Sequence, residues 1–166
     1  MHDDRPTHQQ RLQGILRQGG PSGPTDAGGG EGECAAFGYL RGAKDSASSI
    51  ELRFSDGNST WFPYAWLGNW KFNPSEGLLL KFSGDLVYLV LIRGSNLDKP
   101  LPEGSVNLTR AGLQRQRVIW LREMSDEDIR STGEDGPTID RIEVGEFESH
   151  KELKEWLSER APGFMH

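Results

Sequence analysis

The sequence has one cysteine, Cys34, among its 166 residues, so no disulfide can form within the chain. A reducing cytoplasm is therefore the compartment we expect. No stretch reaches the roughly 18 consecutive apolar residues that a membrane span needs. The N-terminus is polar and acidic and lacks the apolar core of a secretory signal. We expect a cytoplasmic protein without a membrane partner.

Histidine is equally scarce where chemistry would need it. His2, His8 and His166 lie near the ends, and His150 falls in the first turn of a predicted surface helix. One cysteine and one histidine in the folded part exclude ordinary zinc-ligand spacings. No glycine-rich loop precedes a helix, as a phosphate-binding loop requires. We therefore expect a non-catalytic protein with no metal and no cofactor.

Carboxylates are plentiful, and their densest cluster is Asp126, Glu127 and Asp128. Consecutive residues on a helix point in different directions, so this cluster fits helix N-terminal charges better than a catalytic pair. A carboxylate-based enzyme without a recognisable motif remains a third alternative for the function.

Glycine and proline are concentrated near the N-terminus. Residues 19–32 hold seven glycines and two prolines and no large apolar side chain. Such a stretch cannot bury enough surface to offset the entropy of ordering it. We expect a disordered, Gly-rich tail over residues 1–33, a single β-rich domain over 34–160 and a short tail over 161–166.

The centre of the chain has the period of β-strands. Ile50, Leu52 and Phe54 alternate with charged residues, and Asp56-Gly57 then predicts a hairpin turn. Strands are also predicted over 34–42, 59–72, 78–82, 86–92, 117–123 and 138–144. Pro63 cannot donate to a ladder, so the aromatic stretch 59–72 is an edge strand or bends there.

Residues 86–92 (LVYLVLI) are apolar on both faces of the predicted strand. Full burial of one large side chain contributes about 1.5–3 kcal/mol, so this strand should be central and covered on both sides. Either a second layer of the same chain or a partner subunit supplies the cover.

Helices are few. Ser149 and Glu152 form a capping box ahead of a C-terminal amphipathic helix. Ser125 begins a second short helix, and residues 109–116 a third. The predicted fold class is α+β and β-rich: a small, mostly antiparallel sheet or barrel of six to eight strands, with the C-terminal helix packed across it.

Three residues are predicted to lie at an interface. Trp61 has the opposite parity to the other aromatics of its strand, which places it away from the core at a subunit or ligand contact. Arg110 and Arg115 belong to a stretch, residues 105–122, with four arginines and no carboxylate. These cations could bind phosphates, or the protein's own acidic segment over residues 125–166, which has a net charge of −7. The intramolecular contact is the favoured alternative.

Residues 92–97 (IRGSNL) end a strand, and an Ile-Arg-Gly-x-Asn-aliphatic run resembles the second signature of the Sm/LSm family. The preceding hairpin, residues 50–63, also looks like the opening strands of that family's small five-stranded barrel. The resemblance implies single-stranded RNA binding, with Arg93 stacking on a base and Gly94 and Asn96 shaping the loop. It does not extend to the family's first signature, because no Asp lies between Gly57 and Asp85.

The sequence therefore favours a non-catalytic binding or assembly module, β-rich and self-associating, with a homo-oligomer or another protein as its partner. Sm-like binding of single-stranded RNA is the alternative.

Overall fold

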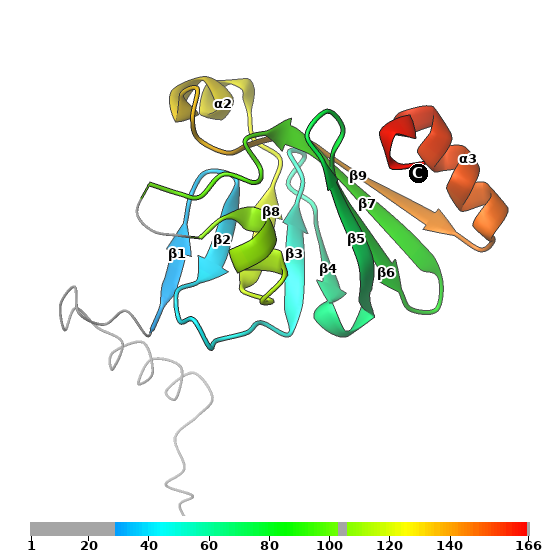
Figure 1. Cartoon of the computed structure of the whole chain (residues 1–166), viewed down its shortest axis with the longest axis horizontal. Coiled ribbons are helices and arrows are strands. Elements are labelled where there is room, and N and C mark those ends of the chain that lie inside the picture. Colours follow the sequence, from blue (N-terminus) through cyan, green and yellow to red (C-terminus); the bar gives the residue numbers. More distant parts are fainter. Residues whose placement is uncertain (1–28, 103–105, 166) are drawn as a thin grey trace, which may run out of the picture.

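The computed structural model describes residues 29–102 and 106–165, which contain nine strands in two sheets packed face to face (Figure 1). The strands are β1 Glu31–Glu33, β2 Phe37–Leu40, β3 Ser49–Arg53, β4 Ser59–Pro63, β5 Leu67–Asn73, β6 Gly77–Ser83, β7 Val87–Ser95, β8 Val118–Arg122 and β9 Thr138–Phe147. The five-stranded sheet has the order β1-β2-β8-β3-β4, and the four-stranded sheet the order β5-β6-β7-β9. Only β3 and β8 pair in parallel. The β-rich α+β class is confirmed, and these sheets do not close into a barrel.

The main core lies between the inner faces of the two sheets. Ile50 and Leu52 of β3 are fully buried there against β6 and β7, which contribute Leu80 and Ile92. The alternation of apolar and charged residues in β3 therefore reports which face of the five-stranded sheet points inward. The opposite face of that sheet carries its charged residues.

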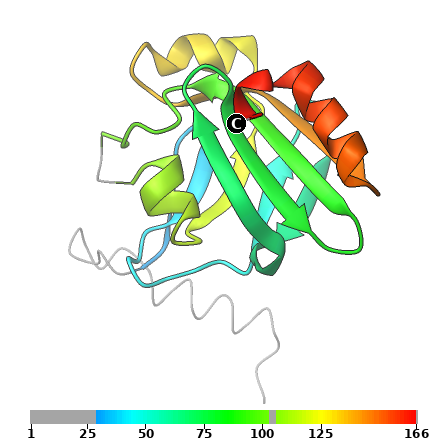
Figure 2. The ribbon, with the colours of Figure 1, turned by 45° about the vertical axis from the view of Figure 1, so that its right-hand side comes forward.

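A second core covers the outer face of the four-stranded sheet. Leu89 and Leu91 of β7 point away from the main core and pack under α3, His150–Arg160, through Leu153 and Leu157 (Figure 2). β7 is thus central and buried on both faces, as its apolar sequence predicts. The cover comes from a layer of the same chain.

The aromatic stretch 59–72 forms two strands in different sheets, so the expectation of one strand was wrong. β4 ends at Pro63, a 3₁₀ turn (η1, Tyr64–Trp66) follows, and β5 begins at Leu67. Pro63 lies at a position whose N–H would point away from β3, so its missing donor costs this ladder nothing, and the Tyr64 N–H bonds the Ser48 carbonyl. The buried Tyr64 hydroxyl donates to the Val118 carbonyl at 2.6 Å and fixes the turn. β4 is an edge strand and the chain bends after Pro63, as expected.

The short helices begin at the predicted caps. Ser125 accepts a hydrogen bond from the Asp128 N–H at the start of α2, Asp126–Thr132, and Ser149 accepts one from Glu152 at the start of α3. The stretch expected to be helical over 109–116 forms a single π-helical turn, η2, Leu108–Leu113. None of the helices in the described part of the chain is long and apolar enough to cross a membrane.

Both predicted domain boundaries need correction. β1 pairs with β2 at residues that were assigned to the tail, so the folded part begins by Glu31. The rest of the expected N-terminal tail, residues 1–28, lies outside the described residues. The expected C-terminal tail is packed, because Ala161 and Phe164 are buried in the second core. An alanine and one aromatic residue give too weak a pattern to predict that packing.

Candidate functional site

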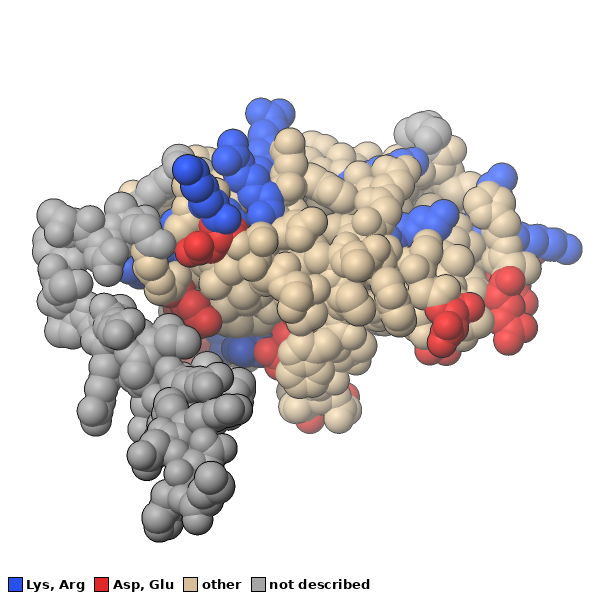
Figure 3. All heavy atoms as spheres, turned by 90° about the horizontal axis from the view of Figure 1, so that it is seen from below, with Lys and Arg blue, Asp and Glu red and all other residues tan. Residues whose placement is uncertain are grey.

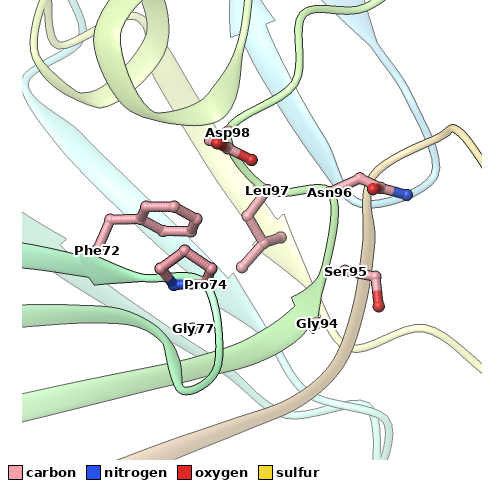
Figure 4. Close-up of a pocket in the computed structure, with 8 residues that line it drawn as sticks. All are labelled: Phe72, Pro74, Gly77, Gly94, Ser95, Asn96, Leu97 and Asp98. Carbon is pink, nitrogen blue, oxygen red and sulfur yellow. The ribbon is translucent and has the colours of Figure 1, made fainter. Parts of the chain in front are cut away.

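The IRGSNL segment forms the end of β7 and the turn after it. One side of this turn lines an open hollow of about 250 Å³ between β7 and the β5–β6 turn (Figure 4). Leu97 points into the hollow towards Pro74, whereas the Asn96 side chain points away from it. The structure therefore brings the three expected ligand-binding residues together, but it does not aim them at one cavity.

Arg93 makes intramolecular contacts with its guanidinium. It lies 3.5 Å from the Glu76 carboxylate and 3.8 Å from that of Glu143, and it donates to the Arg160 carbonyl at the end of α3. These contacts tie the C-terminus of α3 to the four-stranded sheet. Such a position supports a structural role for Arg93 over base stacking.

Gly94 and Asn96 likewise have structural explanations. A Cβ at Gly94 would collide with the Thr138 carbonyl oxygen, because β9 approaches β7 closely at a register shift. Asn96 adopts a φ of 58°, and its amide donates to the carbonyls of Glu134 at 2.8 Å and Gly136 at 3.0 Å. Asparagine tolerates this left-handed backbone better than most residues. Together these two residues hold the loop before β9 against the end of β7.

The four arginines of residues 105–122 divide into two pairs. Arg117 is buried and donates to the carbonyls of Leu40 and Arg41, both at 2.9 Å. Arg122 bonds the Ala35 carbonyl and lies 3.4 Å from Asp128, so the favoured contact with the acidic segment holds for this residue.

Arg110 and Arg115 are exposed, and neither forms an ion pair with a carboxylate in the described part of the chain. The expected contact with the acidic segment is therefore absent for these two residues within residues 29–102 and 106–165. Figure 3 shows Lys and Arg side chains in separate groups along one face of the molecule, with Asp and Glu side chains between them. The interface prediction for Arg110 and Arg115 stays open.

The outer face of the five-stranded sheet, which we call the open face, carries no helix of the described chain (Figures 1 and 2). One row of neighbouring residues crosses it from β1 to β4. The row consists of Glu33, Gly38, Trp120, Glu51 and Trp61. Arg53 and Arg122 are partners in the adjacent row. Two tryptophans and two arginines thus share one uncovered sheet face.

Trp61 is the most exposed large apolar residue on this face. Its side chain is 59% exposed at the edge strand β4. The bonds from Phe54 N–H to Asn58 and from Tyr64 N–H to Ser48 fix which groups of β4 face β3. By the alternation of an antiparallel ladder, the N–H and C=O groups of Ser59 and Trp61 point outward. Within the part of the chain that the structure describes, the site combines an unpaired strand edge with an exposed indole.

Trp120 lies at the middle of the open face and is only 8% exposed. The Arg53 guanidinium covers its ring at 4.4 Å, and a Cβ at Gly38 would collide with the indole. Trp120 separates two shallow hollows, of about 340 and 430 Å³. Sequence reasoning missed Arg53, Trp120 and Arg122 as site residues. The polar face of the 50–54 strand was the signal available for Arg53.

The described residues contain no group of three or more His, Cys, Asp or Glu side chains that could hold a metal ion. Cys34 is half-buried, and desolvation by burial raises the pKa of its thiol. His150 lies exposed in the first turn of α3. The open face therefore offers contact area and charged groups for binding.

No protein-family model matches the chain, and neither a curated protein nor a solved structure shows significant similarity to it. The open face and its edge are the features of the chain that point to a function.

Proposed function

We propose that the chain is a non-catalytic binding and assembly module that self-associates through the β4 edge. The observation that carries this proposal is Trp61, 59% exposed on an edge strand. Aromatic side chains are enriched at protein interfaces, and an unpaired strand edge is a template for pairing with another chain.

A second copy fits this edge because its pattern of donors and acceptors is self-complementary. In an antiparallel pair centred on Trp61, the two Trp61 residues exchange N–H and C=O bonds across a two-fold axis. Each Ser59 N–H then meets the carbonyl of Pro63 in the other copy. Pro63 has no N–H to return, so the Ser59 carbonyl takes no part in this ladder. The two indoles lie side by side on the extended open face.

Analytical ultracentrifugation over a concentration series tests the pairing. The wild-type chain should dimerise, and Trp61→Lys should be monomeric because two lysines would lie directly opposite each other where the indoles pair. Thr60→Lys is the matched control, since Thr60 is also exposed on β4 but belongs to its other face. Circular dichroism should show all three chains folded. A monomeric wild-type chain, or equal dimerisation of both variants, would contradict the proposal.

Single-stranded RNA binding is the second candidate, and the exposed Arg110 and Arg115 favour it. Phosphate contacts release counterions, so the affinity for a mixed-sequence oligonucleotide should fall steeply with salt. Arg110→Ala and Arg115→Ala should each reduce that salt slope by about one. Fluorescence anisotropy measures both quantities, and an absence of binding at low salt would exclude this candidate.

A further inference from the structure

A hollow of about 340 Å³ on the open face is bordered by Arg53 and Arg122. Its lining consists of Glu33, Cys34, Ala35, Arg53, Trp120 and Arg122. No residue of β4 lines it, so a ligand in this hollow would not depend on the proposed pairing of β4 edges.

The two guanidinium groups come from neighbouring strands. Arg53 and Arg122 are register partners in the parallel β3–β8 pair, so their side chains leave the same sheet face one strand spacing apart. They remain 41% and 37% exposed. Like charges at such positions repel; the carboxylates of Glu51 and Asp128 offset part of that repulsion, and a bound anion would relieve the remainder.

Each guanidinium is held by its inner nitrogen. The Arg53 Nε lies 3.0 Å from a Glu51 carboxylate oxygen, and the Arg122 Nε donates to the Ala35 carbonyl at 2.9 Å. Of the two, only Arg122 uses a terminal nitrogen in a further ion pair with a residue that the structure describes, at 3.4 Å from Asp128. The Nε contacts restrict how the side chains can turn and leave terminal N–H groups available.

Trp120 keeps the Arg53 guanidinium in place. The stacked ring and guanidinium, 4.4 Å apart, favour one orientation of the cation. Gly38 provides the space that the indole needs beside β2. The arginine pair is therefore arranged before any ligand arrives, which lowers the entropy cost of binding.

We propose that this hollow binds an oxyanion, a phosphate or carboxylate group, between the terminal nitrogens of Arg53 and Arg122. Arginine matches both groups with paired, charge-assisted hydrogen bonds. Glu33 on the rim opposes a large anionic surface, which favours a single small anionic group.

Cys34 lines the same hollow and is the chain's one cysteine, so its alkylation reports on the site. Iodoacetate is anionic and iodoacetamide neutral, and both react with the same thiolate. The iodoacetate rate divided by the iodoacetamide rate is therefore independent of any change in the thiol pKa between variants. In Arg53→Gln and Arg122→Gln that ratio should fall about threefold or more, because the positive potential is lost. Arg130→Gln, an exposed arginine of α2 outside the hollow, should leave it unchanged.

Inorganic phosphate and succinate are the two ligand probes. At constant ionic strength each should slow the reaction of Cys34 with iodoacetamide in a saturable manner, and the tighter probe identifies the preferred oxyanion. Chloride should give no saturable effect. Arg53→Gln should abolish the protection. This variant retains the Arg122 contacts with Ala35 and Asp128, so it tests the site even if Arg122→Gln fails to fold. Absence of protection by both probes in the wild-type chain, or equal protection in Arg53→Gln, would overturn the proposal.

Discussion

Arg117 is a buried cation whose hydrogen-bond partners in the described chain are carbonyl groups. Its guanidinium donates to Leu40 and Arg41, with a longer contact of 3.5 Å to the Ala111 carbonyl. This side chain joins the end of β2 to η2 and β8. Burying a charge is costly unless hydrogen bonds compensate it, so the loss of these bonds would destabilise the fold strongly. A structural role therefore accounts for Arg117 in the arginine-rich stretch 105–122, and no bound ligand is needed to explain it.

Arg117→Ala should lower the free energy of unfolding by about 3 kcal/mol, because charged hydrogen bonds are lost and buried carbonyls remain unpaired. Urea denaturation measures the change. Arg110→Ala, in the same run but exposed, should change stability by less than about 0.5 kcal/mol. Similar losses for both variants would show that Arg117 is not a structural cation.

Tyr64 should make the fold sensitive to alkali. Burial raises the pKa of its hydroxyl above the usual value of 10.0. An unfolded chain therefore loses this proton near pH 10 while the folded chain keeps it, so stability falls as pH rises above 10. Below that pH the contribution of Tyr64 is fully present.

Tyr64→Phe tests this directly. At neutral pH the variant should be less stable by about 1–2 kcal/mol, since the Val118 carbonyl loses its donor. Above pH 10 the difference should shrink by about 1.4 kcal/mol per pH unit, because only the wild-type chain has the Tyr64 titration. Denaturation curves at pH 7, 10 and 11 measure the gap, and a constant gap would contradict the assignment.

At the scale of elements, the junction of β7 and β9 depends on Gly94. Gly94→Ala should destabilise the fold by about 3 kcal/mol, because the new methyl group would force the two strands apart at Thr138. Gly68→Ala on β5 is the control, since its nearest neighbour, the Lys81 carbonyl oxygen, would be 3.9 Å away. Thermal denaturation compares the two. Equal stability of both variants would return Gly94 to consideration as a ligand-binding residue.

The sequence predicted the elements better than their pairing. Period and turn residues located most strands, and capping residues located α2 and α3, because these signals are local. The parallel alignment of residues 51–53 with 120–122 is set by packing between distant segments. For that reason the pairing of Arg53 with Arg122 on the open face could not be predicted. The exposure of Trp61 could be, because side chains alternate between the two faces of a strand.

The contacts of Arg93 also could not be predicted from the local sequence. Its place at the end of an apolar strand was predictable, but its partners Glu76, Glu143 and Arg160 lie on three other segments. A motif of six residues specifies a local backbone, and the surrounding chain decides whether an arginine meets solvent or carboxylates. Sequence alone could therefore propose Arg93 for a ligand and could not supply its contacts.

At the scale of the whole molecule, both sheets share one core, so neither should unfold alone. Calorimetry should show one transition with equal calorimetric and van't Hoff enthalpies. The Trp61→Lys variant is suited to this measurement if it is monomeric, because dimer dissociation would otherwise contribute. Two resolved transitions would show that the sheets are separate cooperative units.

The position of β8 also has a consequence for biosynthesis. β8 lies between β2 and β3, yet it follows seven strands in the chain. Until residues 118–122 leave the ribosome, the β1–β2 and β3–β4 hairpins lack the strand that joins them. Both β2 and β3 then present unpaired edges in a nascent chain that already contains the most apolar strands, a species prone to aggregation. Folding of the five-stranded sheet is thereby delayed until Arg122 has emerged from the ribosome.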